Sequence, residues 1–340
     1  KAKNASLEAT GHGFKIIKEK EGVTVDYDKT VEQLYTYVTE KWNKKANIKL
    51  TATTTVSKPK YTTEDCKKVS NEPMGSYTTE FSVGSSYANR NLNIQNGAKL
   101  INGAVVYPGE QYSCNENLYP WTEDNGWHPA GTYVDGGVQD SLGGGICQVS
   151  STLYNALLRA EIKVVKRFPH SMAVGYVPLS ADAALAGDYK DLVFENDTDA
   201  PIYVQGIYNS GGSITFNIYG HDTRKAGHSV KYESKTIKTT PVKTQTKKDS
   251  SKPVGYSEVE SSGHVGYVAE LWKITYEDGK QVSKELIHTS TYAMSPTIVV
   301  KGTKKASATS KKDDSDKDHK KSSEETTKKS TSSKKSKKSE

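Results

Sequence analysis

Apolar residues recur at helical spacing in two stretches of the chain. In residues 28–42 they fall on one face of a predicted helix, for which Asp28 is the expected N-cap. The second stretch is QVSSTLYNALLRAEI, residues 148–162, where Val149 and Leu153 belong to one apolar stripe. The spacing therefore predicts two amphipathic helices.

The remaining apolar residues alternate with polar ones, which is typical of strands. Long alternating runs cover residues 228–246 and 269–292, and Asp278-Gly279 inside the second run predicts a hairpin turn. Residues 61–69 predict a capped turn into a short helix. Shorter strand-like runs are predicted at residues 48–61, 103–109, 171–179, 191–196, 201–209 and 213–220.

Changes in composition divide the 340 residues into several parts, and the fold class predicted is α+β and multidomain. We expect a small mixed domain at residues 1–75 and a β-rich domain with one principal helix at residues 76–222. An elongated β-module is expected at residues 227–302, followed by a Lys/Ser-rich tail at residues 303–340. The tail has almost no apolar side chains to bury, so we expect it to be disordered.

The net charge of +7 limits the class of partner. Residues 301–340 contain 14 Lys and 7 Asp or Glu, so they account for the whole excess and the rest of the chain is neutral. We therefore expect no nucleic-acid groove in the folded part. No apolar run reaches the ~18 residues of a spanning helix. Because the sequence starts at Lys1 and not at Met, we expect a mature or trimmed fragment in which no membrane anchor is present, and the sequence does not show whether one was removed.

The segment LGGGICQVSST, residues 142–152, carries the strongest chemical signal. Three glycines lead into Cys147 at the predicted start of a helix. The unpaired N–H groups and the dipole at a helix N-terminus favour a thiolate over a thiol. The same N–H groups can bind an oxyanion during acyl transfer. Candidates for this oxyanion and substrate loop are Gly144, Gly145, Ile146 and Gln148.

A thiolate nucleophile needs a base or cationic partner, and His170 in the tripeptide PHS is the first candidate. It is predicted on the strand that follows the helix, which is the general layout of papain-type thiol enzymes. Asp182, Asp188 and Asp191 follow in the sequence as candidates for an orienting carboxylate, and the sequence does not choose among them.

Other interpretations of these residues stay open. A Cys at a helix start is often only a small core residue. Cys147, His170 and His128 are also conceivable zinc ligands, but no closely spaced ligand pair supports a metal, and we expect none. His128 and Ser171 are candidates for lining the site, with packing or surface exposure as the alternative for His128. The other two cysteines have no glycine run or nearby His and are expected to be inert thiols.

GGGICQVSSTLYNALL followed by FPHSMAVGYVPL resembles the VanW-like family of bacterial cell-surface proteins. The resemblance extends back to LINGAVVYPG and forward to NIYGH. The segment GVTVDYDKTVEQL looks like part of a peptidoglycan-binding domain, and GHVGYVAELWKITYEDGKQVSKELI resembles the G5 domain. In this resemblance the family's Cys falls on Cys147 and its PHS histidine on His170.

The resemblance implies an extracellular protein of the cell wall or surface of a Gram-positive bacterium. The activity it implies is an L,D-transpeptidase, which forms diaminopimelate-to-diaminopimelate crosslinks through a Cys thioester and needs no cofactor. The implied partners are peptidoglycan stem peptides and glycan, and the basic tail adds anionic wall polymers.

Two rival functions stay open beside this one. A cysteine hydrolase would use the same site with water as the acceptor. A non-catalytic wall-binding or adhesion module would have no chemistry at Cys147.

Overall fold

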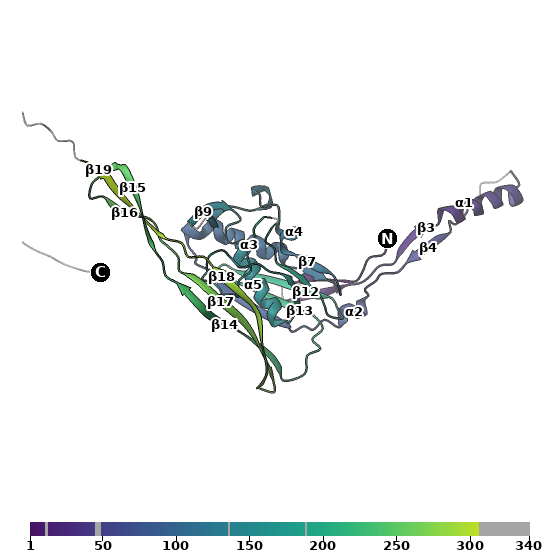
Figure 1. Ribbon diagram of the computed structural model, residues 1–340. Helices are drawn as coiled ribbons and strands as arrows, with labels where there is room; N and C mark the ends of the chain where they lie inside the picture. Colours follow the sequence, from purple (N-terminus) through teal and green to yellow (C-terminus); the bar gives the residue numbers. More distant parts are fainter. Residues whose placement is uncertain (11–12, 45–48, 135–136, 188, 306–340) are drawn as a thin grey trace, which may run out of the picture.

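The computed structural model describes residues 1–305, apart from residues 11–12, 45–48, 135–136 and 188. The predicted tail lies outside the described residues from residue 306 onward. The described part is elongated, with a central mixed domain between an N-terminal arm and a C-terminal β-module (Figure 1). The α+β, β-rich, multidomain architecture expected from the sequence is confirmed.

The central domain is built on an antiparallel sheet with the strand order β5-β13-β12-β6. Two helices of 14 residues pack beside it, α3 (Ala88–Ile101) against β12 and α5 (Ile146–Arg159) against β5 and β13. The strands of this sheet are β5 (Gly75–Glu80), β6 (Ala104–Val106), β12 (Ile202–Asn209) and β13 (Ser213–Tyr219).

Helix α5 is the predicted helix, and its apolar stripe is in the core. Val149, Leu153 and Leu157 have no exposed surface, and the helix starts at Ile146, two residues before the predicted range. Helix α3 was not predicted. Its buried face includes Asn91 and Asn93, and these polar residues interrupt the apolar period that reveals a helix in a sequence.

Smaller elements complete the central domain around the ends of these helices. They are the sheet β10-β11-β7, the hairpin β8–β9, and short helical turns. Their bounds are β7 (Gln111–Ser113), β8 (Pro129–Val134), β9 (Gly137–Leu142), β10 (Lys163–Lys166), β11 (Val193–Glu195), α4 (Cys114–Leu118), η2 (Ser85–Tyr87) and η3 (Glu123–Asn125).

Two predictions near β10 are wrong. Residues 171–179 form no strand, and His170 lies in the irregular segment after β10 rather than on a strand. Met172 and Val177 are buried, so the apolar residues of this segment serve packing and not a sheet.

The N-terminal arm contains a first pair of strands that forms a hairpin, a second antiparallel pair of strands, and, in the chain between the strands of this second pair, a helix that points away from the central domain (Figure 1). Leu7 and Phe14 of the first hairpin pack on Tyr203 and Tyr219 of the central sheet. The elements are β1 (Ser6–Thr10), β2 (Gly13–Ile17), β3 (Gly22–Val25), β4 (Thr54–Ser57), α1 (Tyr27–Thr36), the π-helical turn η1 (Tyr37–Lys41) and α2 (Thr63–Lys67).

The structure corrects one detail of the arm and confirms another. The side chain of Asp26, not Asp28, caps α1, and the predicted apolar face of this helix is exposed, for example at Val31 and Leu34. Helix α2 begins with the predicted cap, a capping box between Thr62 and Asp65.

The C-terminal module consists of two three-stranded sheets, β14-β17-β18 and β15-β19-β16. The first sheet lies beside the central domain and the second extends away from it (Figure 1). The predicted hairpin turn is confirmed, with Asp278 and Gly279 both at positive φ. The strands are β14 (His228–Thr240), β15 (Thr244–Pro253), β16 (Ser257–Ser261), β17 (Gly266–Glu277), β18 (Lys280–Tyr292) and β19 (Thr297–Lys304). In the described part of the chain, no helix is long and apolar enough to span a membrane.

Candidate functional site

Cys147 lies in the first turn of α5, which follows directly on the glycine run after β9. Gly144 packs so closely on β8 that a Cβ atom at this position would lie 2.4 Å from the carbonyl oxygen of Ala130. Gly145 is the N-cap residue and has a φ of +107°, which other residues rarely adopt. These two glycines therefore let the helix begin immediately before Cys147.

The Cys147 thiol is partly buried and contacts the backbone of Leu185. The Leu185 N–H donates to Sγ at 3.4 Å, and the Leu185 carbonyl oxygen also lies 3.4 Å from Sγ. Burial raises the pKa of Cys147, but a hydrogen bond with His170 and the charge of that imidazole outweigh burial, and the pKa lies below its ordinary value. Burial raises the pKa of the other thiols, Cys66 and Cys114.

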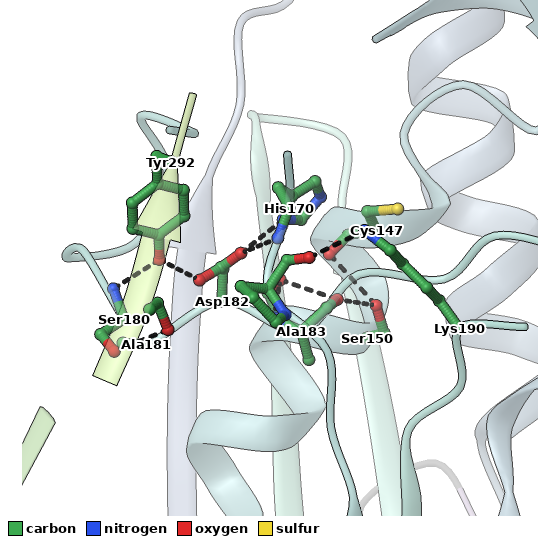
Figure 2. A network of polar contacts seen from close by, with 12 residues as sticks. Cys147, Ser150, His170, Ser180, Ala181, Asp182, Ala183, Lys190 and Tyr292 are labelled. Atoms are coloured by element: carbon green, nitrogen blue, oxygen red, sulfur yellow. Dashed lines mark hydrogen bonds and ion pairs between the residues drawn. The ribbon is translucent and has the colours of Figure 1, made fainter. Parts of the chain in front are cut away.

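The His170 imidazole interacts with Cys147 on one side and with Asp182 on the other. Its Nδ1–H donates to Oδ2 of Asp182 at 2.6 Å, and its backbone N–H donates to the same oxygen at 2.7 Å (Figure 2). Burial lowers the pKa of His170, but the hydrogen bonds with Asp182 and Cys147 raise it to about 9. With Nδ1 bonded to Asp182, Nε2 is the nitrogen that remains for chemistry at the thiol.

Asp182 is 1% exposed, and its carboxylate accepts four hydrogen bonds. Two come from His170, and Oδ1 accepts one from Arg167 Nη2 at 2.8 Å and one from the Tyr292 hydroxyl at 2.5 Å. Burial raises the pKa of Asp182, but the hydrogen bond from His170 and the charge of Arg167 bring it well below its ordinary value. The carboxylate therefore stays charged although it is buried.

Polar side chains of α5 hold the segment that carries Asp182. Ser151 Oγ accepts a hydrogen bond from the Ala183 N–H at 2.9 Å, and Ser150 Oγ donates to the Ala183 carbonyl oxygen at 2.7 Å. Asn155 donates to the carbonyl oxygen of Ala181 at 2.7 Å. One rigid helix therefore positions both Cys147 and the residues on either side of Asp182.

The lowered pKa of Cys147 and the raised pKa of His170 both favour a thiolate–imidazolium pair over a neutral thiol and imidazole. A thiolate is a nucleophile, an imidazolium is an acid, and the carboxylate of Asp182 fixes the orientation of the imidazole. The arrangement therefore contains the groups that acyl transfer through a thioester requires.

The predicted loop residues have structural contacts of their own. Gln148 is buried, and its side chain accepts from Arg90 at 2.6 Å and donates to the Glu80 carbonyl oxygen at 2.9 Å. The N–H groups of Ile146 and Gln148 donate to the carbonyl oxygens of Gly143 and Gly145. The side chain of Gln148 therefore fixes the start of α5 against β5 and does not face the thiol.

The structure separates the other candidates from the thiol. His128 lines an open groove along α3, together with Lys99 and Tyr208. Asp191 accepts hydrogen bonds at the start of α4, from the Ser113 hydroxyl and the Asn115 N–H. Asp188 lies outside the described residues. The carbonyl oxygen of Ser171, beside His170, accepts a hydrogen bond from the N–H of Ala293 at 2.7 Å.

Sequence reasoning missed three residues around the site. The hydroxyl of Tyr176 lies 3.4 Å from Nε2 of His170, and Arg167 and Tyr292 both donate to Asp182. Arg167 and Tyr176 are within six residues of His170, so their nearness in the sequence was an available signal. Tyr292 is 110 residues from Asp182, and no local spacing connects them.

The three cysteines are free, and the described residues hold no group of three or more His, Cys, Asp or Glu side chains that could bind a metal ion.

Three protein families match the chain in the order expected from the sequence. The VanW-like protein family matches residues 89–219, which include Cys147, His170 and Asp182. The G5 domain family matches residues 231–304, which include Tyr292. The family described as "Putative peptidoglycan binding domain" matches residues 1–47. The predicted domain boundaries themselves stay predictions.

The chain is similar to two curated proteins. "Uncharacterized protein YoaR" of Bacillus subtilis is 37% identical over 164 residues, which are 48% of this chain and 53% of YoaR. "Vancomycin B-type resistance protein VanW" of Enterococcus faecalis is 28% identical over 116 residues, which are 33% of this chain and 42% of that protein. The matched region thus spans about half the length of these relatives.

Among solved structures, the G5 domain of an IgA1 protease is 30% identical to this chain. The match covers 24% of the chain and 96% of that structure, with a TM-score of 0.18.

Proposed function

We propose that this chain, which carries a peptidoglycan-binding domain, a VanW-like domain and a G5 domain in that order, is a cysteine L,D-transpeptidase. The observation that carries the proposal is the arrangement of three residues: Cys147 lies in the first turn of α5 near His170, and the Nδ1–H of His170 donates to Asp182 (Figure 2). The N-terminal family, described as a putative peptidoglycan-binding domain, suits an enzyme that works on peptidoglycan outside the cell. Binding to the polymer raises the local concentration of its stem peptides.

In the first half-reaction the Cys147 thiolate attacks the carbonyl between diaminopimelate and the terminal D-Ala of a tetrapeptide stem. The oxyanion that forms is held by N–H groups at the start of α5, and we assign those of Gly145 and Cys147 because Ile146 and Gln148 already donate to the glycine loop. The C–N bond breaks as His170 gives its proton to the leaving amine. The products are a thioester, free D-Ala and a neutral His170.

In the second half-reaction the side-chain amine of diaminopimelate on another stem attacks the thioester. The neutral His170 accepts the proton that this amine loses, and the C–S bond breaks. A new amide crosslinks the two stems, and the thiolate–imidazolium pair returns. Asp182 stays ionised throughout and keeps Nε2 of His170 directed at the reacting atoms.

Intact-mass spectrometry of the full chain with a purified tetrapeptide stem tests this proposal. We expect a mass increase equal to the stem without its D-Ala, located on Cys147, and a crosslinked dimer as product. The Cys147→Ala variant is expected to fold and to form neither species. A fully active Cys147→Ala variant would overturn the proposal.

The same experiment separates the rival functions. Release of a tripeptide stem without any dimer would identify a hydrolase that uses the same thioester. Binding to sacculi that is equal in the parent and in Cys147→Ala, without any acyl-enzyme in the parent, would identify a wall-binding module.

A further inference from the structure

We propose that the G5 domain is part of the catalytic site, and that Tyr292 at the end of β18 is a positioning residue that fixes Asp182 against His170. The inference rests on the function proposed for Cys147 and His170. It assigns to the G5 domain a role inside the site, in addition to any binding of the wall.

The first evidence is the position of the Tyr292 hydroxyl (Figure 2). It donates to Oδ1 of Asp182 at 2.5 Å and accepts the backbone N–H of Ser180 at 2.6 Å. Tyr292 is 3% exposed and both of its partners are buried, so no water replaces the hydroxyl without rearrangement. The Tyr292 hydroxyl therefore links the backbone of Ser180 to the carboxylate of Asp182.

The second evidence is that β18 also contacts the other donor to Oδ1. Ser290 Oγ accepts a hydrogen bond from Arg167 Nη1 at 2.9 Å and lies 2.8 Å from Ser180 Oγ. Ser290 is 1% exposed. The guanidinium of Arg167 is thus fixed between Asp182 on one side and the G5 domain on the other.

The third evidence is that three alternate residues at the end of β18, His288, Ser290 and Tyr292, contact the central domain, in agreement with the two-residue period of a strand. Next to Ser290 and Tyr292 in this row is His288, whose Nε2 lies 2.8 Å from the Tyr154 hydroxyl on α5. Burial and the charge of Arg167 lower the pKa of His288 to about 4, so it is neutral and adds no competing charge near Asp182. The N–H of Ala293 then bonds to Ser171, the neighbour of His170.

These contacts act on the orientation of one carboxylate. The groups that face Asp182 are His170, Arg167 and Tyr292, with His288 and Tyr154 behind them. Arg167 and Tyr292 hold Oδ1, which leaves Oδ2 directed at the imidazole. Without the Tyr292 hydroxyl, Oδ1 keeps only Arg167 as a donor and the Ser180 N–H loses its acceptor, so the carboxylate is held less firmly in its orientation toward His170.

The test is the Tyr292→Phe variant of the full chain, with Tyr267→Phe as the matched control. Tyr267 is the residue opposite Tyr292 in the β17–β18 ladder, so both variants remove one hydroxyl from the same sheet. The rate of alkylation of Cys147 by iodoacetamide is measured by mass spectrometry across the pH range. In Tyr292→Phe we expect the acidic inflection to move up by about half to one pH unit, with alkylation ~3- to 10-fold slower below it. Tyr267→Phe is expected to match the parent.

The outcomes separate the inference from the proposed function. A folded Tyr292→Phe variant with the parent's rate and inflection would overturn the role of the G5 domain and leave the transpeptidase proposal intact. An ordinary thiol titration of Cys147 in the parent would instead overturn the transpeptidase proposal. If Tyr292→Phe does not fold, Ser290→Ala replaces it, and the absence of any upward shift there would overturn the inference.

Discussion

At the scale of single residues, the proposed chemistry depends on the negative charge that Asp182 retains although it is buried. Asp182 is buried, accepts four hydrogen bonds and lies beside Arg167. It gives His170 an anionic partner, and His170 in turn supplies the positive charge that favours the Cys147 thiolate. A change at Asp182 is therefore expected to alter the pKa of Cys147 through His170, without direct contact between Asp182 and the sulfur atom.

The variant Asp182→Asn tests this dependence. It keeps the size of the side chain but removes its charge, so His170 loses its anionic partner and its pKa falls. We expect transpeptidation to drop by ~100-fold or more, as triads do when the carboxylate is replaced by an amide. Steady-state kinetics with stem peptides measures the drop, and near-parental activity would contradict the role given to Asp182.

The pH dependence of acylation follows from the two shifts. The ion pair exists above the lowered pKa of Cys147 and below the pKa of about 9 of His170. As the pH falls through the first value the thiolate is protonated, and as it rises through the second His170 loses the proton that the leaving amine needs. We expect kcat/KM for acylation to be bell-shaped with its alkaline limb near pH 9. Alkylation of Cys147 is expected to show the acidic limb only, and an alkaline limb near pH 6.5 in the acylation profile would contradict this assignment.

At the scale of elements, the glycine run, α5 and the Asp278-Gly279 hairpin were predictable because each is determined by local spacing and local backbone geometry. Helix α3 was not, because it buries Asn91 and Asn93 and so lacks an apolar period. The choice among Asp182, Asp188 and Asp191 also lay beyond the sequence. It depends on how Ser150, Ser151 and Asn155 of α5 hold the neighbouring carbonyl and N–H groups, which is a tertiary arrangement.

The start of α5 offers a prediction at this scale. A Cβ at Gly144 would lie 2.4 Å from a backbone oxygen of β8, so Gly144→Ala must displace the loop that precedes Cys147. We expect a loss of about 1–3 kcal/mol in the free energy of unfolding and slower alkylation of Cys147. Gly175→Ala is the control, because a Cβ there meets nothing within 4 Å. Equal unfolding temperatures for the two variants would contradict the prediction.

At the scale of the whole molecule, a second set of contacts joins the central domain to the G5 domain. The carboxylate of Glu161, just after α5, lies 2.6 Å from Lys273 Nζ and 2.7 Å from His228 Nε2. Burial raises the pKa of Glu161, but the hydrogen bonds with Lys273 and His228 bring it below its ordinary value. This attraction is therefore present above the ordinary pKa of Glu161 and is lost as the pH falls through the lowered value.

Replacement of Glu161 by Gln tests the strength of this contact. Lys273 would lose its anionic partner in a partly buried position and His228 would keep only Glu277, so we expect the free energy of unfolding to fall by roughly 1–3 kcal/mol. Glu260→Gln breaks the exposed ion pair between Glu260 and Lys247 in the sheet β15-β19-β16. This variant is expected to change the free energy of unfolding by less than ~0.5 kcal/mol. Denaturant unfolding at neutral pH measures both, and equal effects would show that Glu161 does not secure the two domains.

The hydrogen bond between Tyr292 and Asp182 also determines the order in which the parts of the candidate site assemble during folding. A chain is synthesised from its N-terminus, and domains generally fold as units in that order. Cys147, His170 and Asp182 therefore precede β18 in synthesis, and α5, which carries Cys147, is able to pack before that strand is available. The carboxylate cannot acquire its complete set of donors until the strand that ends at Tyr292 has docked. The proposed nucleophile, Cys147, thus reaches its final surroundings only when β18 has folded, so a partly synthesised chain carries the residues of the candidate site without their full set of contacts.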